Sequence, residues 1–338
     1  MENYDESKLI ITNEDDFELK YTIKSICYVY YKEIKSLYLF LIVVIIITSF
    51  FIHRLFPIKV CMCVIAKDEN RYIREFIEHY KKYKIDKIFL YDNNDIDGER
   101  YEKILSDYIN EGLVNIIDYR GRDTVQIKSY LECHNNNYKN YDWLIFYDVD
   151  EFLYLKDFND VRTYLKDRRF KHCQRVQLNW IMYTDNNLLY YDNRSLSERF
   201  TEMEPNARNK TSGPPQEFKS MVRGHYLIRK MMCPHIINRE LISCDGFGVR
   251  QKVRTIKTVR SDYEYYYIKH YYSKSLEEFM KKVMRKDGVF TLNTKVKMDK
   301  IKKYFTYNKI TEEKIDFIEE KTGLNLSEYR EKIKNISY

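Results

Sequence analysis

The sequence predicts an α/β fold with a doubly wound, mostly parallel sheet. Apolar strand-like segments alternate with helical segments four times between residues 58 and 147, and polar residues follow the strands. Such alternation is typical of parallel strands joined by crossover helices. Ligands bind at the carboxyl ends of the strands in sheets of this kind.

The individual elements follow from their periodicity. After a first strand at residues 58–65, apolar side chains at Ile73, Phe76, Ile77 and Tyr80 have the i, i+3, i+4, i+7 spacing of a helix that faces a core. The same reasoning predicts strands at 86–91, 114–118 and 143–147, and helices at 101–109 and 124–137. Acidic and amide residues stand at the strand ends, where they would converge on one edge of the sheet.

An uncharged run of sixteen residues, 37–52, precedes this region. A helix that crosses ~30 Å of hydrocarbon needs about 20 residues, so this run is short but sufficient if flanking cations reach the interface. We expect an N-terminal tail over 1–36 and a transmembrane signal anchor over 37–53. A cleaved signal peptide fits poorly, because a long polar stretch precedes the run and no small-residue cleavage site follows it.

Composition and cysteine spacing exclude other classes of protein. The 58 Lys and Arg against 51 Asp and Glu give a net charge of +7, spread along the chain, so we expect no nucleic-acid partner. The seven cysteines form no C-x-x-C pair, which argues against a zinc ribbon or a thioredoxin-like site. Cys61 and Cys63 lie in the apolar first strand and are expected to be buried thiols. Disulfides among the others are compatible with a lumenal domain.

The segment Asp148-Val149-Asp150 is the most informative motif. A second Asp-x-Asp, at Asp95 and Asp97, falls in a loop, whereas Asp148 and Asp150 end a buried strand. Two carboxylates at a strand end repel each other and are costly to bury unless a cation lies between them. Mg²⁺ or Mn²⁺, which prefer oxygen ligands, would serve.

The ordered set of motifs is similar to glycosyltransferase family 92 and its family-2-like relatives. The resemblance rests on residues 65–75, 91–95 and 147–152, and continues through Trp180, 183–186, 197–200, 218–223, His235 and 270–279. It implies a GT-A domain over 59–290 that transfers a sugar from a nucleotide-diphosphate donor, with a UDP-sugar favoured, to a hydroxyl of a glycan or glycoprotein. A divalent metal on the diphosphate and inversion at the anomeric carbon are also implied.

The resemblance also assigns residues. Asp148, Asp150 and His270 would hold the metal; a packing histidine is the alternative for His270, which precedes a capping-box spacing at Ser275 and Glu278. The donor would contact Ala66, Lys67, Glu69, Asp92, Asn94, Arg120, Gln126 and, at the diphosphate, Lys219. The candidates for the base that takes the acceptor proton are Asp185, Glu217 and Asp245. We prefer Asp185, because nearby Trp180 would stack on a sugar.

The sequence does not decide which way the predicted anchor is oriented in the membrane. Four Lys or Arg lie within twenty residues on each side of the anchor, so the charges do not orient it. Analogy to Golgi-type enzymes suggests a single-pass, type II protein of an internal, Golgi- or ER-like membrane, and four N-x-[ST] sequons stand at Asn193, Asn209, Asn325 and Asn335. Residues 291–338 have helical periodicity and are expected to be a packing appendage. The alternatives are a nucleotidyltransferase, although Gly is missing after the first strand, and a non-catalytic membrane-tethered binding module.

Overall fold

The computed structural model describes residues 13–55, 57–205, 207, 212–213, 216–252, 255–257, 261–285 and 293–336, without the side chains of 13–20, 23, 26–27, 49–55, 212–213 and 336. The chain divides after Pro57 into two units. The first unit holds one helix, α1 (Asn13–Leu55). Among the described residues, no helix carries an apolar stretch long enough to cross a membrane. The predicted anchor at 37–53 therefore has no support here, and part of it lies outside the described side chains.

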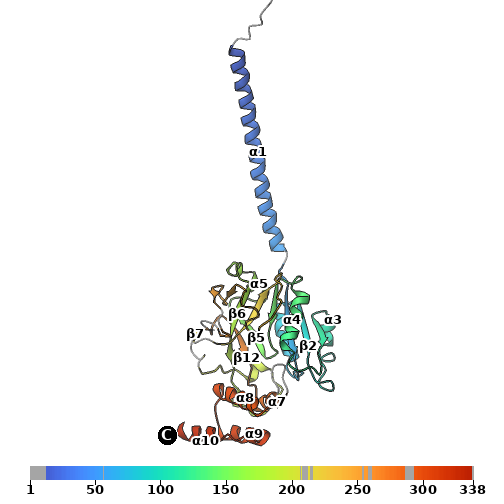
Figure 1. Cartoon of the computed structure of the whole chain (residues 1–338), viewed down its shortest axis with the longest axis vertical. Helices are drawn as coiled ribbons and strands as arrows, with labels where there is room; N and C mark the ends of the chain where they lie inside the picture. Colours follow the sequence, from blue (N-terminus) through green and yellow to red (C-terminus); the bar gives the residue numbers. More distant parts are fainter. Residues whose placement is uncertain are drawn as a thin grey trace, which may run out of the picture. The chain divides into compact units, whose positions relative to one another are not determined.

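The second unit begins with the predicted parallel half-sheet. Its strands β1 (Val60–Ala66), β2 (Lys87–Asp92), β3 (Val114–Asp118) and β4 (Trp143–Phe146) lie in the order β3-β2-β1-β4, and all three pairings are parallel. They are joined by α2 (Ile73–Lys82), α3 (Ser106–Asn110) and α4 (Gln126–Asn137) (Figure 1). The helix predicted at 101–109 is thus shorter, since residues 101–105 form turns.

The two faces of this half-sheet bury different helices. Val60, Met62 and Val64 of β1 pack in one apolar cluster with residues of α2 and α3, whereas Cys61 and Cys63 pack in another with residues of α4. Successive strand residues point to opposite faces, so one strand serves both layers. This two-sided packing confirms the α/β layers that the sequence predicts.

Beyond β4 the sheet becomes mixed. β8 (Phe218–Arg223) pairs antiparallel with both β4 and β6 (Arg175–Met182), and β9 (Ser243–Cys244) and β10 (Arg250–Gln251) extend the sheet past β6. β12 (Tyr266–His270) lies parallel to β6 and antiparallel to β5 (Glu151–Leu155). The shorter elements are α5 (Val161–Lys166), a 3₁₀ turn η1 (Arg168–Phe170), α6 (Leu196–Arg199), and the pair β7 (Ser212–Gly213) with β11 (Ser261–Asp262).

The C-terminal region is helical, as predicted. It comprises α8 (Thr294–Tyr307), α9 (Glu312–Thr322) and α10 (Ser327–Ile336). Their apolar residues share one core with those of α7 (Leu276–Met284), which precedes the predicted boundary at residue 291. Residues 286–292 lie outside the described part of the chain, so the boundary itself stays a prediction.

Two disulfides correct the expectation for the first strand. Cys63 is bonded to Cys133 of α4, with their Cα atoms 5.9 Å apart, and Cys173 is bonded to Cys244 of β9. Cys63 therefore is not a buried thiol, because its side chain faces α4; Cys61 is a buried free thiol as predicted. The bonds fasten α4 to β1 and the segment before β6 to β9.

Candidate functional site

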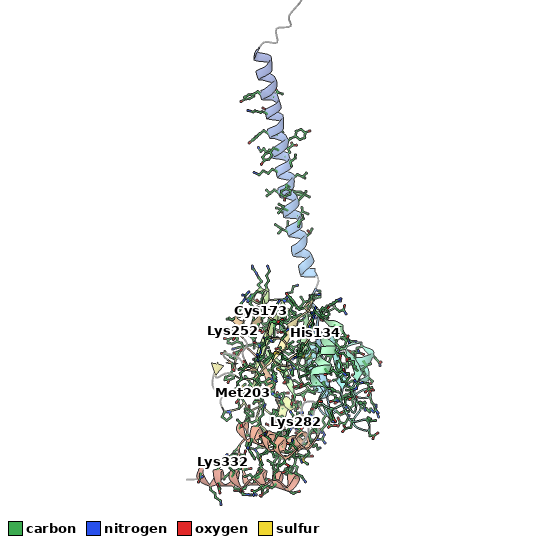
Figure 2. The ribbon with its side chains drawn as sticks, in the orientation of Figure 1. His134, Cys173, Met203, Lys252, Lys282 and Lys332 are labelled. Atoms are coloured by element: carbon green, nitrogen blue, oxygen red, sulfur yellow. A yellow bond between two sulfur atoms is a disulfide. The ribbon has the colours of Figure 1, made fainter. Side chains whose placement is uncertain are left out.

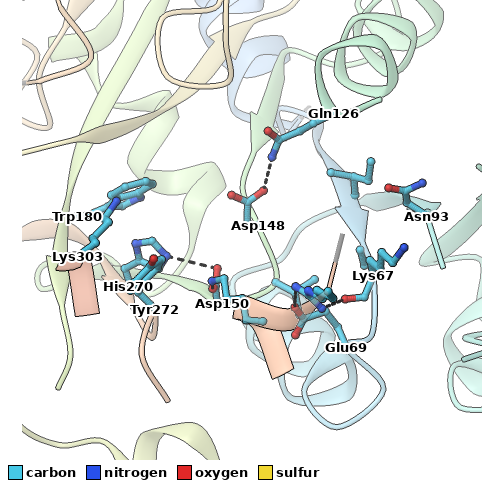
Figure 3. Close-up of a pocket in the computed structure, with 15 residues that line it drawn as sticks. Lys67, Glu69, Asn93, Gln126, Asp148, Asp150, Trp180, His270, Tyr272 and Lys303 are labelled. Atoms are coloured by element: carbon cyan, nitrogen blue, oxygen red, sulfur yellow. Dashed lines mark hydrogen bonds and ion pairs between the residues drawn. The ribbon is translucent and has the colours of Figure 1, made fainter. Parts of the chain in front are cut away.

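A pocket with a volume of about 240 Å³ opens at the carboxyl ends of β1 and β4, where the parallel half-sheet meets β5 and β12 (Figure 3). Such an edge collects side chains from separate strands. Eight of its lining residues are among those singled out from the sequence: Ala66, Lys67, Glu69, Gln126, Asp148, Asp150, Trp180 and His270. The others are Ile65, Asn93, Val149, Tyr272, Lys282, Arg285 and Lys303.

The acidic motif is a tight turn between two strands. After β4, the backbone N–H of Glu151 donates to the carbonyl of Asp148 at 3.1 Å, and the N–H of Asp148 donates to the Glu151 carboxylate at 3.1 Å. Glu151 then opens β5 opposite His270 of β12. The N–H of Tyr271 donates to the carbonyl of Asp150 at 2.9 Å. Strand pairing therefore places His270 beside Asp150, although 120 residues separate them in the sequence.

Asp148 is held by neighbours on three sides. Lys219 Nζ of β8 lies 2.6 Å from its Oδ2, while the Tyr130 hydroxyl and the Gln126 amide donate to Oδ1 at 2.8 and 3.1 Å. Burial raises the pKa of Asp148, but the charge of Lys219 and the hydrogen bonds from Lys219 and Tyr130 together outweigh this, so the pKa lies below its usual value. Lys219 also lies 3.2 Å from Glu151, whose pKa is nevertheless raised well above normal by burial.

Asp150 has a different cation. Lys282 Nζ of α7 lies 2.7 Å from its Oδ2, and His270 Nε2 lies 3.5 Å from its Oδ1. Burial opposes ionisation, yet Lys282 and His270 hold the pKa of Asp150 well below its usual value. Lys219 and Lys282 each place a positive charge beside one of the two aspartates, so the repulsion between these carboxylates does not by itself require a metal.

Three of the residues can nonetheless hold a metal. Ligand atoms of Asp150, Glu151 and His270 lie within 4.8 Å of one another. His270 Nδ1 is buried with no hydrogen-bond partner among the described residues. Carboxylate oxygens with an imidazole nitrogen suit Mn²⁺, and less well Mg²⁺. Asp148, predicted as a ligand, lies outside this set, whereas Glu151 belongs to it. The pairing of Glu151 with His270 in adjacent strands brings Glu151 into the set, and the sequence does not display that pairing.

Four cations line the same pocket. Lys67 pairs with Asp95 at 2.7 Å, Arg285 with Glu69 at 3.1 Å, and Lys303 of α8 approaches Glu217 at 3.7 Å. The fourth is Lys282. Lys303 also lies over the rings of Trp180 and Tyr272, 5.5 and 5.1 Å from their centroids. Reasoning from the sequence missed Lys282 of α7, Arg285 directly after it and Lys303 of α8, because no motif marks them.

The predicted donor contacts Asp92, Asn94 and Arg120 lie outside the pocket and hold the loop after β1. Arg120 pairs with Asp92 at 2.6 Å, and Asp92 Oδ1 accepts from the N–H of Asn94 at 3.0 Å. Asn94 Oδ1 in turn accepts from the N–H of Asp68 at 2.7 Å, which holds Asp68 at a positive φ of 55°. Asp92, Asn94 and Arg120 therefore shape the loop after β1 but do not line the pocket. Lys219 does not line the pocket either; its ammonium pairs with Asp148 and Glu151.

The three candidate bases occupy different places. Asp185 is buried, pairs with Lys314 at 2.6 Å and accepts from the Tyr304 hydroxyl, and it does not line the pocket. Asp245 accepts backbone N–H groups of Phe247 and Val249 within a turn. Glu217 contacts Lys303, which does line the pocket. The preference for Asp185 is thus not supported by its position, whereas Glu217 is adjacent to the site.

A mixed α/β sheet with a charged pocket at the carboxyl ends of its parallel strands has the architecture of nucleotide-binding proteins. The chain belongs to glycosyltransferase family 92, which it matches over residues 56–323. This confirms the resemblance and places the chain in a family of glycosyltransferases. A family 92 protein of rice, Oryza sativa subsp. japonica, is 25% identical over 114 residues, which cover 33% of this chain and 19% of the rice protein.

Two solved structures are among those that the chain matches in part. Residues 1–349 of TarS from S. aureus, in complex with UDP-GlcNAc, are 13% identical and match 73% of this chain and 71% of that one, with a TM-score of 0.36. GalNAc-T7 with UDP, GalNAc and Mn²⁺ is 16% identical and matches 38% of this chain and 23% of that one, with a TM-score of 0.28.

Proposed function

We propose that this chain is a GT-A-type glycosyltransferase that transfers a sugar from a nucleotide diphosphate, with a UDP-sugar favoured, to a hydroxyl of a glycan or glycoprotein. Family membership supports the reaction class. The observation that carries the proposal is one pocket in which Asp150 and His270 face four cations. Carboxylate and imidazole ligands suit a metal, and cations suit the phosphates that it would bridge.

Each group then has a role that its position supports. Asp150, His270 and Glu151 would hold Mn²⁺ or Mg²⁺, which stabilises negative charge on the departing diphosphate. Arg285 and Lys303 would contact the phosphates from the α7–α8 side of the pocket. Asp148, half-buried and paired with Lys219, would position the turn that carries Asp150.

Inversion requires a base on the acceptor side, and Glu217 is our candidate. Its side chain is 26% exposed and lies 3.7 Å from Lys303, which lines the pocket. A carboxylate there would take the proton of the acceptor hydroxyl as the new glycosidic bond forms. Trp180 also lines the pocket, but its ring is buried and Lys303 lies over it.

A screen of donor hydrolysis tests the reaction class. The full-length protein would be incubated with UDP-, GDP- and dTDP-sugars, with Mn²⁺, with Mg²⁺ or with EDTA, and the released nucleotide measured. We expect hydrolysis of a UDP-sugar that EDTA abolishes. Release of pyrophosphate from a nucleoside triphosphate and sugar phosphate would instead indicate a nucleotidyltransferase. Thermal stability that no nucleotide changes would indicate a non-catalytic binding module.

We also propose that residues 37–53 anchor the protein in an internal membrane with the enzyme domain in the lumen. Support comes from the uncharged run, from the two disulfides, which form in oxidising compartments, and from exposed sequon residues at Asn193, Asn325 and Asn335. Asn209 lies outside the described residues. We expect the protein to resist carbonate extraction and to lose mass with a glycan-specific endoglycosidase. Extraction without detergent, or a mass without glycan, would contradict this placement.

A further inference from the structure

The ammonium of Lys282 occupies the position beside Asp150 that a metal ion would need. It lies 2.7 Å from Oδ2, while His270 Nε2 approaches the other carboxylate oxygen at 3.5 Å. Both oxygens of this proposed ligand are therefore engaged by nitrogen atoms of the protein. A divalent cation cannot share that oxygen with an ammonium, because like charges at such a distance repel.

We propose that Lys282 is an exchangeable counter-ion, displaced from Asp150 when the metal arrives and then paired with the donor diphosphate. The inference rests on the function proposed above and extends it by assigning Lys282 a positioning role. The protein would thus carry a cation at Asp150 whether or not metal is bound. A metal without nucleotide would compete with Lys282, whereas metal and diphosphate together would give both cations a partner.

The helix that carries Lys282 is firmly placed. Ser275 and Glu278 form a capping box at the start of α7. Glu278 is also paired with buried Arg199 at 2.7 Å and accepts from the Tyr72 hydroxyl. The backbone of α7 therefore stays in place, so an exchange of partners requires movement of the Lys282 side chain alone.

That side chain has room and a second contact. It is 27% exposed, although its partner Asp150 is 7% exposed, and it lines the pocket (Figure 2 shows its place on the domain). Its ammonium lies 4.5 Å from the centroid of the Tyr272 ring. A flexible four-carbon stem over an aromatic face can swing without breaking buried packing.

The cations around the Lys282 side chain favour its movement away from Asp150 toward a bound anion. Arg285, one turn further along the chain, and Lys303 line the same pocket. Three cations around one small space repel one another, and a diphosphate between them would relieve that repulsion. Lys282 would therefore move from a carboxylate that gains a metal to a phosphate that lacks a partner.

Metal binding measured separately from activity tests this exchange. Free Mn²⁺ would be followed by electron paramagnetic resonance during titration of the full-length chain, with and without UDP. We expect Lys282→Met to bind Mn²⁺ about tenfold more tightly than the wild type without UDP, because the competing cation is gone. With Mn²⁺ saturating, UDP should bind about tenfold more weakly. Lys282→Arg, which keeps the charge, should resemble the wild type in the first measurement.

Lys281→Met is the matched control. Its side chain is 57% exposed and pairs with Glu277, so it should change neither affinity. Equal Mn²⁺ affinity of the wild type and Lys282→Met, with both folded by circular dichroism, would overturn the exchange while leaving the metal site intact. If Lys282→Met does not fold, Lys282→Gln provides the same comparison. Failure of every protein to bind Mn²⁺ even with UDP would overturn the metal assignment itself, and the exchange with it.

Discussion

Lys219 Nζ lies 2.6 Å from Asp148 Oδ2 and 3.2 Å from Glu151 Oε1, so one buried ammonium contacts both carboxyl groups of the acidic turn. The pairing crosses from β8 to the end of β4, which are antiparallel neighbours. The turn is thus held by charge from the adjacent strand before any ligand binds. Its shape should depend on Lys219.

Replacing Lys219 with Met should therefore destabilise the fold. The change leaves the half-buried Asp148 carboxylate and the buried Glu151 carboxyl group without their cation, and the loss should not exceed the about 3–5 kcal/mol that breaking a fully buried pair costs. Urea unfolding followed by circular dichroism measures the loss. In the Lys219→Met background, Asp148→Asn should restore part of the stability, because it removes one of the uncompensated charges.

Lys171→Met, at an exposed position, is the control for the loss of one lysine. It should change stability by less than about 0.5 kcal/mol. If Lys219→Met unfolds at the same urea concentration as Lys171→Met, the Lys219 pairing contributes nothing to the fold.

The two aspartates of the acidic motif should separate activity from stability. Asp150→Ala removes a proposed metal ligand, so donor hydrolysis should fall at least ~100-fold. Its stability should change by no more than about 1 kcal/mol, because the freed Lys282 can be solvated. Asp148→Asn should lose less activity but more stability, since Lys219 then keeps only Glu151. Hydrolysis rates and melting temperatures of both variants, with and without Mn²⁺, would be compared; a folded, fully active Asp150→Ala protein would rule out the proposed metal site.

The sequence predicts the first half of this domain well, because its segments have clear periodicity. The strand at 143–147 and the helix carrying Ile73, Phe76, Ile77 and Tyr80 correspond to β4 and α2. The capping box before α7 is also where the spacing of Ser275 and Glu278 places it. Each of these features depends on residues only a few positions apart, whose spacing can be read from the sequence.

The site is less predictable because long-range pairing builds it. Glu151 joins the possible metal ligands through the pairing of β5 with β12, and Lys282 and Lys303 reach the pocket from α7 and α8. No motif or period marks Lys282 or Lys303, and the motif at 147–152 does not show that Glu151 will pair with His270. Conversely, Asp185 follows an aromatic segment that suggested a sugar site, yet Lys314 and Tyr304 bury it against the C-terminal helices. Charged residues in a sequence do not reveal which partner they will meet.

A buried histidine should make stability depend on pH. Burial lowers the pKa of His79 from 6.5 to about 4. Nε2 of its ring forms a hydrogen bond with the Leu153 carbonyl oxygen at 3.0 Å. The unfolded chain therefore binds the proton more readily than the folded one. The neutral His79 ring therefore contributes fully to the free energy of unfolding above pH 6.5, and this contribution is lost as the pH falls toward 4.

His79→Gln, which keeps an N–H donor, should reduce this loss by an amount on the order of 2 kcal/mol between pH 7 and pH 4.5. Urea unfolding at both pH values measures it. His225→Asn, at an exposed position, should leave the pH dependence unchanged. Equal pH dependence in the wild type and His79→Gln would show that His79 does not contribute.

The Cys63–Cys133 bond joins residues 70 apart in the sequence and should stabilise the oxidised domain. Cross-linking a long loop restricts the unfolded chain, so Cys133→Ala should cost about 2–5 kcal/mol in urea unfolding. Dithiothreitol should lower the stability of the wild type further than that of the variant, which retains only the Cys173–Cys244 bond among the two described disulfides. Cys233→Ser, at a free cysteine, is the control and should leave the response to dithiothreitol unchanged. Mass spectrometry of non-reduced peptides should find both linkages, and alkylation of all seven cysteines in the denatured, unreduced protein would contradict them.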